Sequence, residues 1–359
     1  AIWMAATVSF TACEVDTTTV MFEEDHDFSQ PGDTVFSMLG ILDKVQDVVE
    51  KGVLLGELRG DLVKPDPFVG TSSAWVDLTR FENLENATFN RYRDYYAIVN
   101  NCNFYLERAD AEMERRGQKV FLKEYAAVSA YRAWAYLQLA LLYGEVPFYT
   151  QPLLSYSEIE QVMNDPSKRK GLGEICSYFI DDLLPYVDVP FPNYGNFTYD
   201  QSSSVNSSDF FLPIRLLRGD LYLWRGSLDG NKSDFAKAAQ EYRDYLLSEK
   251  RFVSPDVKVA YRTVDMDGAQ IVDRWSSVFL GNNYNESISL VPFAGNSQYG
   301  KLGSLRQSFR SFMGSDALQK LVDESYYCYV MYTEESESGE SEYMSRFTGL
   351  AKDTLYYGT

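Results

Sequence analysis

Histidine is nearly absent from this sequence. Its single copy, His26, stands in an acidic stretch that contains Glu23, Glu24, Asp25 and Asp27. A zinc site with two histidine ligands is therefore excluded, and so is a Ser-His-Asp triad in the folded body. The sequence predicts neither a metal site nor a cofactor.

Positive charge is scarce as well. The 359 residues include 33 Lys and Arg against 52 Asp and Glu, which gives a net charge of −19 and a pI near 4.5. Proteins that bind duplex nucleic acid draw their affinity from clustered basic side chains that displace counterions from the phosphates. This charge balance excludes nucleic acid as a partner.

Cysteine is also rare, with four residues in the chain. Cys102, Cys176 and Cys328 are widely separated and form no Cys-x-x-Cys pair, so we expect buried thiols rather than a zinc knuckle or a redox centre. Cys13 differs from the other three, because it directly follows an uncharged apolar run, AIWMAATVSFTA, at 1–12.

This apolar run is too short to span a bilayer as a helix and is typical of the end of a secretory signal. Its last three residues precede Cys13 in a pattern that resembles a bacterial lipobox, in which the cysteine carries lipid. We therefore expect lipidation at Cys13. An apolar run that precedes a cysteine by chance is the alternative.

Helical periodicity, by contrast, is abundant. Apolar residues recur every three or four positions over 92–113, and Gly117 is expected to close that helix near residue 116. A second helix over 124–143 carries two apolar stripes, which predicts burial on both sides. Gly144 and Pro147 are expected to end it.

A second pair of helices is predicted at 214–228 and 233–246, with Ser233 as the N-cap of the latter. Shorter patterns predict helices over 35–49 and 175–183. Helix-turn-helix pairs of this length indicate a mainly α fold with a tetratricopeptide-like scaffold whose repeat is degenerate. The length of the chain suggests two domains, or one domain with a large insertion.

Long segments rich in Pro, Gly, Asn, Ser and Tyr separate the helices. They span 56–90, 147–170, 185–210 and 251–310. Loops of this length in a folded protein are usually functional or disordered, and their aromatic residues favour function. Beyond residue 250, short apolar runs such as Ser287 to Phe293 predict edge strands.

The segment RAWAYLQLALLYGEVPFYT at 132–150 resembles the central helix and exit turn of the SusD/RagB family, surface lipoproteins of Bacteroidetes-type bacteria. Other segments agree in order: GELRGDLV at 56–63, YRDYYAIVNNCNFYLERAD at 92–110 and LRGDLYLWRGSLDGNKSDFAKAAQEY at 217–242. The resemblance weakens beyond residue 250. It divides the chain into a partial signal peptide (1–12), a lipidated acidic tether (13–33), a helical scaffold with loop insertions (34–250) and a loop-rich C-terminal part (251–359).

This resemblance implies a SusD-like α/α superhelix with long ligand-binding loops and few short strands. It also implies a non-enzymatic lipoprotein, anchored on the outer face of the cell outer membrane, that captures oligosaccharides for nutrient uptake. Members of the family deliver their ligand to a SusC-like, TonB-dependent β-barrel transporter. In RagB-like branches the ligand is an oligopeptide.

Two loop clusters combine flat aromatic rings, which stack on sugar rings, with side chains that hydrogen-bond to hydroxyl groups. The first cluster contains Trp75, Asp77, Arg80 and Asn83. The second contains Trp275, Asn282, Asn283, Tyr284 and Asn285. The resemblance favours the first cluster, because the family commonly places its ligand aromatics before the long helix that begins here near Tyr92. As an alternative, each Trp packs against the helical body and only holds its loop in place.

Two motifs imitate other kinds of site. GNSQYGK at 295–301 has seven positions of a phosphate-binding loop, but Leu302 replaces the Ser or Thr that would hold Mg²⁺. DGNKSD at 229–234 imitates the start of a calcium loop, and a turn between two helices explains it more simply. A glycoside hydrolase or esterase, and a tetratricopeptide-like adaptor that grips a protein partner, stay open as alternative functions.

Overall fold

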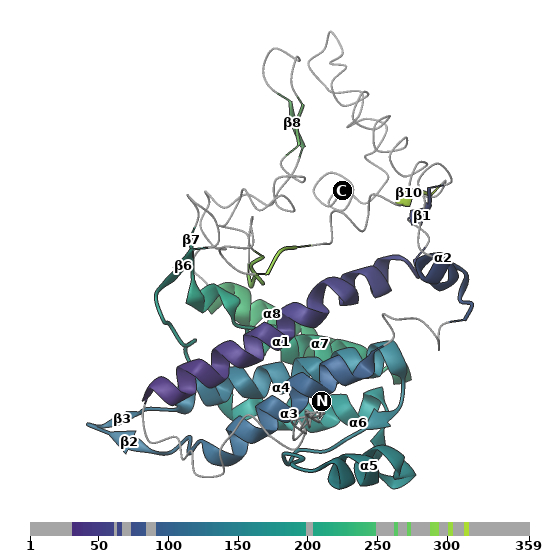
Figure 1. Ribbon diagram of the computed structural model, residues 1–359. Coiled ribbons are helices and arrows are strands. Elements are labelled where there is room, and N and C mark those ends of the chain that lie inside the picture. The colour runs from purple at the N-terminus through teal and green to yellow at the C-terminus, as the bar shows by residue number, and fades with distance from the viewer. Residues whose placement is uncertain are drawn as a thin grey trace, which may run out of the picture.

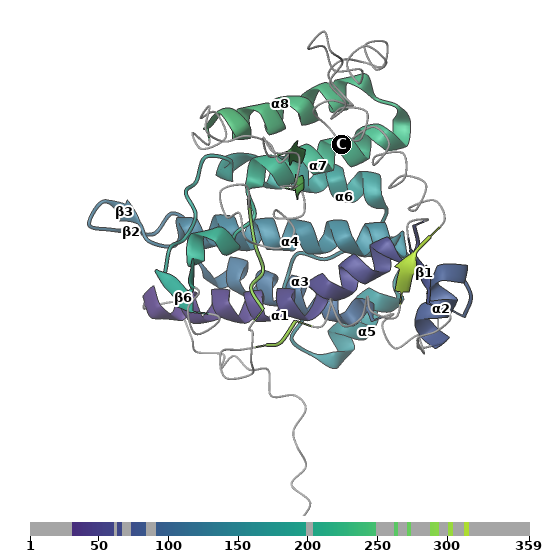
Figure 2. The same cartoon turned by 90° about the horizontal axis from the view of Figure 1, so that it is seen from above.

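The computed structural model describes residues 31–60, 63–66, 73–83, 91–198, 204–248, 262–264, 271–273, 288–293, 301–303 and 312–315. Six helices form the body: α1 (Pro31–Glu57), α3 (Tyr92–Arg108), α4 (Leu122–Tyr143), α6 (Leu172–Asp182), α7 (Ile214–Asp229) and α8 (Lys232–Ser248). Each packs against the next, from α1 on α3 through to α7 on α8, as Figures 1 and 2 show. This arrangement confirms the mainly α, tetratricopeptide-like fold. Two short helices, α2 (Ser73–Arg80) and α5 (Tyr156–Asn164), lie at the edge of the stack.

The described strands are short and form antiparallel pairs. The pairs are β1 (Val63–Pro65) with β10 (Phe312–Gly314), β2 (Glu114–Arg115) with β3 (Gln118–Lys119), β4 (Val146–Pro147) with β5 (Arg169–Lys170), β6 (Asn196–Thr198) with β7 (Ser204–Asn206), and β8 (Arg262–Val264) with β9 (Ile271–Asp273). Short 3-10 turns cover Pro166–Lys168, Leu184–Tyr186 and Ser207–Phe210. The core comes mainly from the helices, with Val146 of β4 also buried in it.

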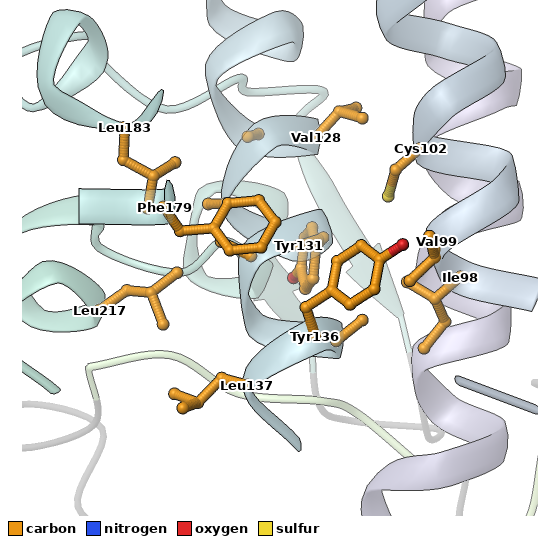
Figure 3. Close-up of a cluster of buried hydrophobic side chains, with 14 of the residues drawn as sticks. Ile98, Val99, Cys102, Val128, Tyr131, Tyr136, Leu137, Phe179, Leu183 and Leu217 are labelled. Atoms are coloured by element: carbon orange, nitrogen blue, oxygen red, sulfur yellow. The ribbon is translucent and has the colours of Figure 1, made fainter. Parts of the chain in front are cut away.

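The core lies around α4, which is buried on both sides as its two apolar stripes predict. Figure 3 shows the side chains that meet there: Ile98, Val99 and Cys102 from α3; Val128, Tyr131, Tyr136 and Leu137 from α4; Phe179 from α6; Leu183 just after it; and Leu217 from α7. Burial raises the pKa of both the Cys102 and the Cys176 thiol to about 12, so these cysteines are inert, as predicted. Cys328 lies outside the described residues.

Arg132, a charged residue of α4, is buried in this core and is 7% exposed. Its guanidinium donates to Asn103 Oδ1 at 3.2 Å and to Asp182 Oδ2 at 3.1 Å. A buried cation is tolerated only when such partners replace its water. Arg132 therefore ties α3, α4 and α6 together.

The prediction that the helix beginning at Tyr92 continues to residue 116 is wrong. α3 ends at Arg108, where Ala109 turns into an extended conformation (φ −82°, ψ 123°). The chain then forms the β2–β3 hairpin, and Gly117 (φ 73°) adopts its left-handed conformation in the hairpin turn instead of a helix cap. The apolar spacing continues to Met113 because that side chain reaches the core from the hairpin base.

Three smaller expectations also need correction. α8 begins at Lys232, so Ser233 is not its N-cap; the Asn231 side chain accepts from the Ser233 amide at 3.0 Å. α1 runs to Glu57, well beyond the expected 35–49. The expected edge strand at Ser287 to Phe293 is not a strand over its described part, 288–293, because it bonds to single groups of separate elements, such as the Asp209 carbonyl at 2.8 Å.

No helix among the described residues is both long enough and apolar enough to cross a bilayer. The division of the chain at residues 12, 33 and 250 stays a prediction.

Candidate ligand-binding site

The first predicted site cluster lies on α2, a helix inside the segment expected to be a loop. Leu78 is buried against Leu54, Leu55 and Leu58, which belong to the C-terminal end of α1 and the residue just after it. Trp75 packs on the edge of this leucine cluster and is partly buried. α2 therefore docks on the end of α1, next to the β1–β10 pair (Figures 1 and 2).

The structure separates Trp75 from its predicted polar neighbours. Successive residues of a helix are rotated by about 100°, so Asp77 and Arg80, three positions apart, share a face, whereas each lies well over a right angle from Trp75. Trp75 faces the leucine cluster with Leu78, and Arg80 is exposed. This placement favours the alternative in which Trp75 holds its segment on the helical body.

An exposed ring that the sequence analysis missed follows α2 directly. Phe81 is 63% exposed and has a positive φ of 58°. Asn83 also has a positive φ, 49°, and the Glu82 amide donates to the Asp77 carbonyl at 2.9 Å. Left-handed backbone is uncommon for a residue with a bulky side chain and often marks a functional site. Arg80 and Asn83, which flank this ring in the sequence, are exposed as well.

A tyrosine cluster stands beside this region, at the C-terminal end of α4. Tyr143 meets Tyr92 edge to face at 6.1 Å between ring centroids, and Tyr92 is 51% exposed. The neighbouring Leu142 packs against both the main core and the leucine cluster under α2, which connects the two clusters. Sequence periodicity places Tyr92 and Leu142 in helix stripes and carries no signal for this surface role.

The Tyr143 hydroxyl is buried and has no hydrogen-bond partner among the described residues. Burial raises the pKa of Tyr143, and the carboxylate of Asp94 adds to the shift while Arg59 opposes it. Asp94 itself is held by Lys51 Nζ at 3.0 Å and by Arg91 Nη2 at 3.2 Å. The cluster thus leaves Tyr92 half-exposed and keeps the Asp94 carboxylate paired.

The fold of this chain has counterparts among solved structures, although no protein-family model matches the sequence and no curated protein matches it either. A SusD superfamily protein from Bacteroides thetaiotaomicron has a TM-score of 0.57 at 13% identity, over 91% of this chain and 72% of that one. The chain has the SusD-like fold.

Two further structures support this SusD-like fold. A SusD superfamily protein from Bacteroides vulgatus has a TM-score of 0.53 at 13% identity, over 87% of this chain and 67% of that one. NanU from B. fragilis has a TM-score of 0.51 at 17% identity, over 75% of this chain. The chain spans less than half the length of some matched structures, 49% of NanU and 42% of another SusD superfamily protein from Bacteroides vulgatus.

Within this SusD-like fold, the Tyr-Gly-Glu-Val-Pro turn at 143–147 has a structural role. Gly144 ends α4 with a φ of 78°, and Val146–Pro147 pairs with Arg169–Lys170. The Tyr96 hydroxyl donates to the Pro147 carbonyl at 2.6 Å. The Tyr-Gly-Glu-Val-Pro turn therefore fastens the α4 exit to α3.

The two imitation motifs also have structural roles where the structure describes them. Lys301 Nζ, the lysine of the phosphate-loop imitation, lies 2.6 Å from Asp43 Oδ1 and 2.9 Å from Asp47 Oδ1 of α1. In the DGNKSD turn Gly230 caps α7 in a left-handed conformation, and Asp234 pairs with Arg225. The predicted turn between two helices is confirmed, since α7 ends at Asp229 and α8 begins at Lys232. Among the described residues no group of three or more His, Cys, Asp or Glu is placed to hold a metal ion.

The second predicted cluster, Trp275 with Asn282, Asn283 and Tyr284, lies outside the described residues, and so does Cys13. Both stay predictions.

Proposed function

We propose that this chain is a non-catalytic, surface-exposed lipoprotein of the cell outer membrane that captures oligosaccharides and passes them to a SusC-like, TonB-dependent β-barrel transporter. The observation that carries the proposal is the SusD-like fold, found over 91% of the chain. The lipobox-like residues before Cys13 and the segment resemblances support it from the sequence. An oligopeptide ligand is the alternative.

The end of α2 supports glycan capture through its chemistry. A sugar ring offers an apolar face that stacks on an aromatic side chain, and hydroxyl groups that bond to planar amides, carboxylates and guanidinium groups. Arg80 and Asn83 flank the exposed Phe81 in the sequence, and Asp77 shares a face of α2 with Arg80. We propose that the ligand contacts this surface, and Trp75 and Trp275 stay separate predictions from the sequence.

Replacement of Phe81 by Ala tests this placement. Trp75 is less suitable, because its loss also disturbs the leucine cluster. The chain would carry Cys13→Ser to prevent lipidation and would be titrated with oligosaccharides in a calorimeter. We expect Phe81→Ala to weaken binding about tenfold, which is the loss of one ring contact of about 1.4 kcal/mol.

The matched control is Phe36→Ala, since Phe36 is also a strongly exposed ring, 76%, but stands near the start of α1. Its affinity is expected to equal that of the parent chain. Equal losses in both variants, or none in either, would place the ligand elsewhere.

The anchor and the transporter need a separate experiment. Cells that express the chain would be fed a labelled fatty acid, and the chain would be purified from outer membranes. We expect label on the parent chain, none on the Cys13→Ser variant, and a β-barrel transporter that co-purifies with the parent. Recovery of an unlabelled parent from the cytosol would contradict this part of the proposal.

A further inference from the structure

The β2–β3 hairpin, Glu114–Lys119, projects from the helical body as a separate arm in both Figure 1 and Figure 2. All six of its residues are exposed. Its base is fixed, because the Val120 amide donates to the Met113 carbonyl at 3.1 Å and both side chains pack partly against the main core. The hairpin is therefore held in place at its base, and its tip is exposed to solvent.

The turn at the tip contains an unfavourable residue. Arg115 pairs with Gln118, so the loop has two residues, Arg116 with φ 53° and Gly117 with φ 73°. Positive φ at both positions is the type I′ turn, which strongly favours Asn or Asp before the Gly. A long side chain such as Arg is strained there, and strain of this kind is usually retained for function.

Charge at the tip is opposite to that of the chain. Residues 115–119, Arg-Arg-Gly-Gln-Lys, include three cations and no acid, in a chain whose net charge is −19. Lys119 Nζ is engaged with Glu112 Oε2 at 2.6 Å, and Lys119 also stands opposite Glu114 in the ladder. Arg116 in the turn and Arg115 before it give the tip its positive charge, and the planar guanidinium of Arg116 matches a carboxylate in a two-bond geometry.

We propose that this hairpin is a docking arm for a partner protein that presents carboxylates on its surface. A membrane fits less well, because 114–119 contains no apolar side chain to insert, and Glu112 and Glu114 flank the cations. The arm precedes α4, which has 22 residues and is about 33 Å long, and α2 docks near the opposite end of α4. A partner on the arm therefore leaves the α2 surface free, and the proposal does not depend on the glycan function.

The test measures binding of a fluorescent hexaglutamate peptide to the full chain by anisotropy, at low salt and at about 0.15 M salt. The Arg115→Glu/Arg116→Glu variant is expected to lose at least about tenfold in affinity. The control is Lys232→Glu/Arg243→Glu on α8, which changes the net charge equally at two exposed cations. Equal losses in both variants would show that net charge alone matters and would overturn the proposal.

A second variant separates function from folding. Arg116→Asn suits the turn better, so it is expected to raise Tm while it weakens peptide binding several-fold. An unchanged affinity would overturn the proposal, since Arg116 would then have no role in recognition. Two other results would also overturn it: arginine-dependent binding to phosphatidylserine vesicles without peptide binding, and arginine-dependent self-association of the chain in sedimentation.

Discussion

Gly219 shows how a single residue sets the distance between two helices. It lies in α7 where the Tyr242 ring of α8 packs, and a Cβ at this position would lie 2.7 Å from Tyr242 Cδ1 and 2.8 Å from Tyr242 Cζ. The Tyr242 hydroxyl also donates to Asp220 Oδ1 at 2.6 Å, which holds the ring in place. The α7–α8 contact therefore requires a residue without a side chain at position 219.

Gly219→Ala is expected to destabilise the chain by about 1–3 kcal/mol, because the added methyl must displace a ring that is hydrogen-bonded in place. Gly40→Ala is the control: Gly40 is an exposed α1 glycine, and a methyl group added to it would have nothing within 4 Å. It is expected to stabilise by about 0.5–1 kcal/mol through helix propensity. Urea unfolding of both variants checks this, and a harmless Gly219→Ala would contradict the packing described.

At the scale of elements, the long helices could be predicted because their apolar spacing extends over several turns. α3, α4, α7 and α8 are predictable for this reason, although the end of α3 is not. α5 is missing from the predicted helices, yet its start carries a signal: Ser155 and Glu158 form a capping box. α2 could not be predicted because eight residues with three inward contacts, Ala74, Trp75 and Leu78, give too short a pattern.

The pairing of Asp234 with Arg225 joins the ends of α7 and α8. Arg225 Nε and Nη2 donate to the two carboxylate oxygens of Asp234 at 2.7 and 2.8 Å, and Asp234 is 3% exposed. These hydrogen bonds lower the pKa of Asp234 from its ordinary value of 3.8. The folded state thus binds this proton more weakly than the unfolded state, so the stabilisation is complete above about pH 4 and is lost as the pH falls through the lowered pKa.

Asp234→Asn is expected to cost about 1.5–3 kcal/mol at pH 7, because a charged hydrogen-bonded pair is broken. The difference from the parent chain is expected to shrink as the pH falls toward 3. Asp229→Asn, the same change at an exposed residue at the end of α7, serves as control. Urea unfolding between pH 3 and pH 7 checks this, and a gap that does not change with pH would refute the role of the carboxylate.

At the scale of the whole molecule, the helical architecture could be predicted from the repeated helical periodicity and from the segments that resemble the SusD/RagB family. The candidate site could not be predicted in the same way, because contacts far apart in the chain shape its surroundings. β1 pairs with β10, which begins at Phe312, and Lys301 pairs with Asp43 and Asp47. No local sequence pattern encodes such pairings. The role of Phe81 as a candidate ligand contact could therefore be recognised only in the structure.

Capture without cleavage is the central claim, and calorimetric titration of the unlipidated chain with a panel of neutral oligosaccharides and oligopeptides tests it most directly. The account predicts saturable binding of at least one oligosaccharide class, with the ligand recovered uncut after prolonged incubation. Hydrolysis of the ligand, binding of peptides alone, or no binding by either class would contradict it.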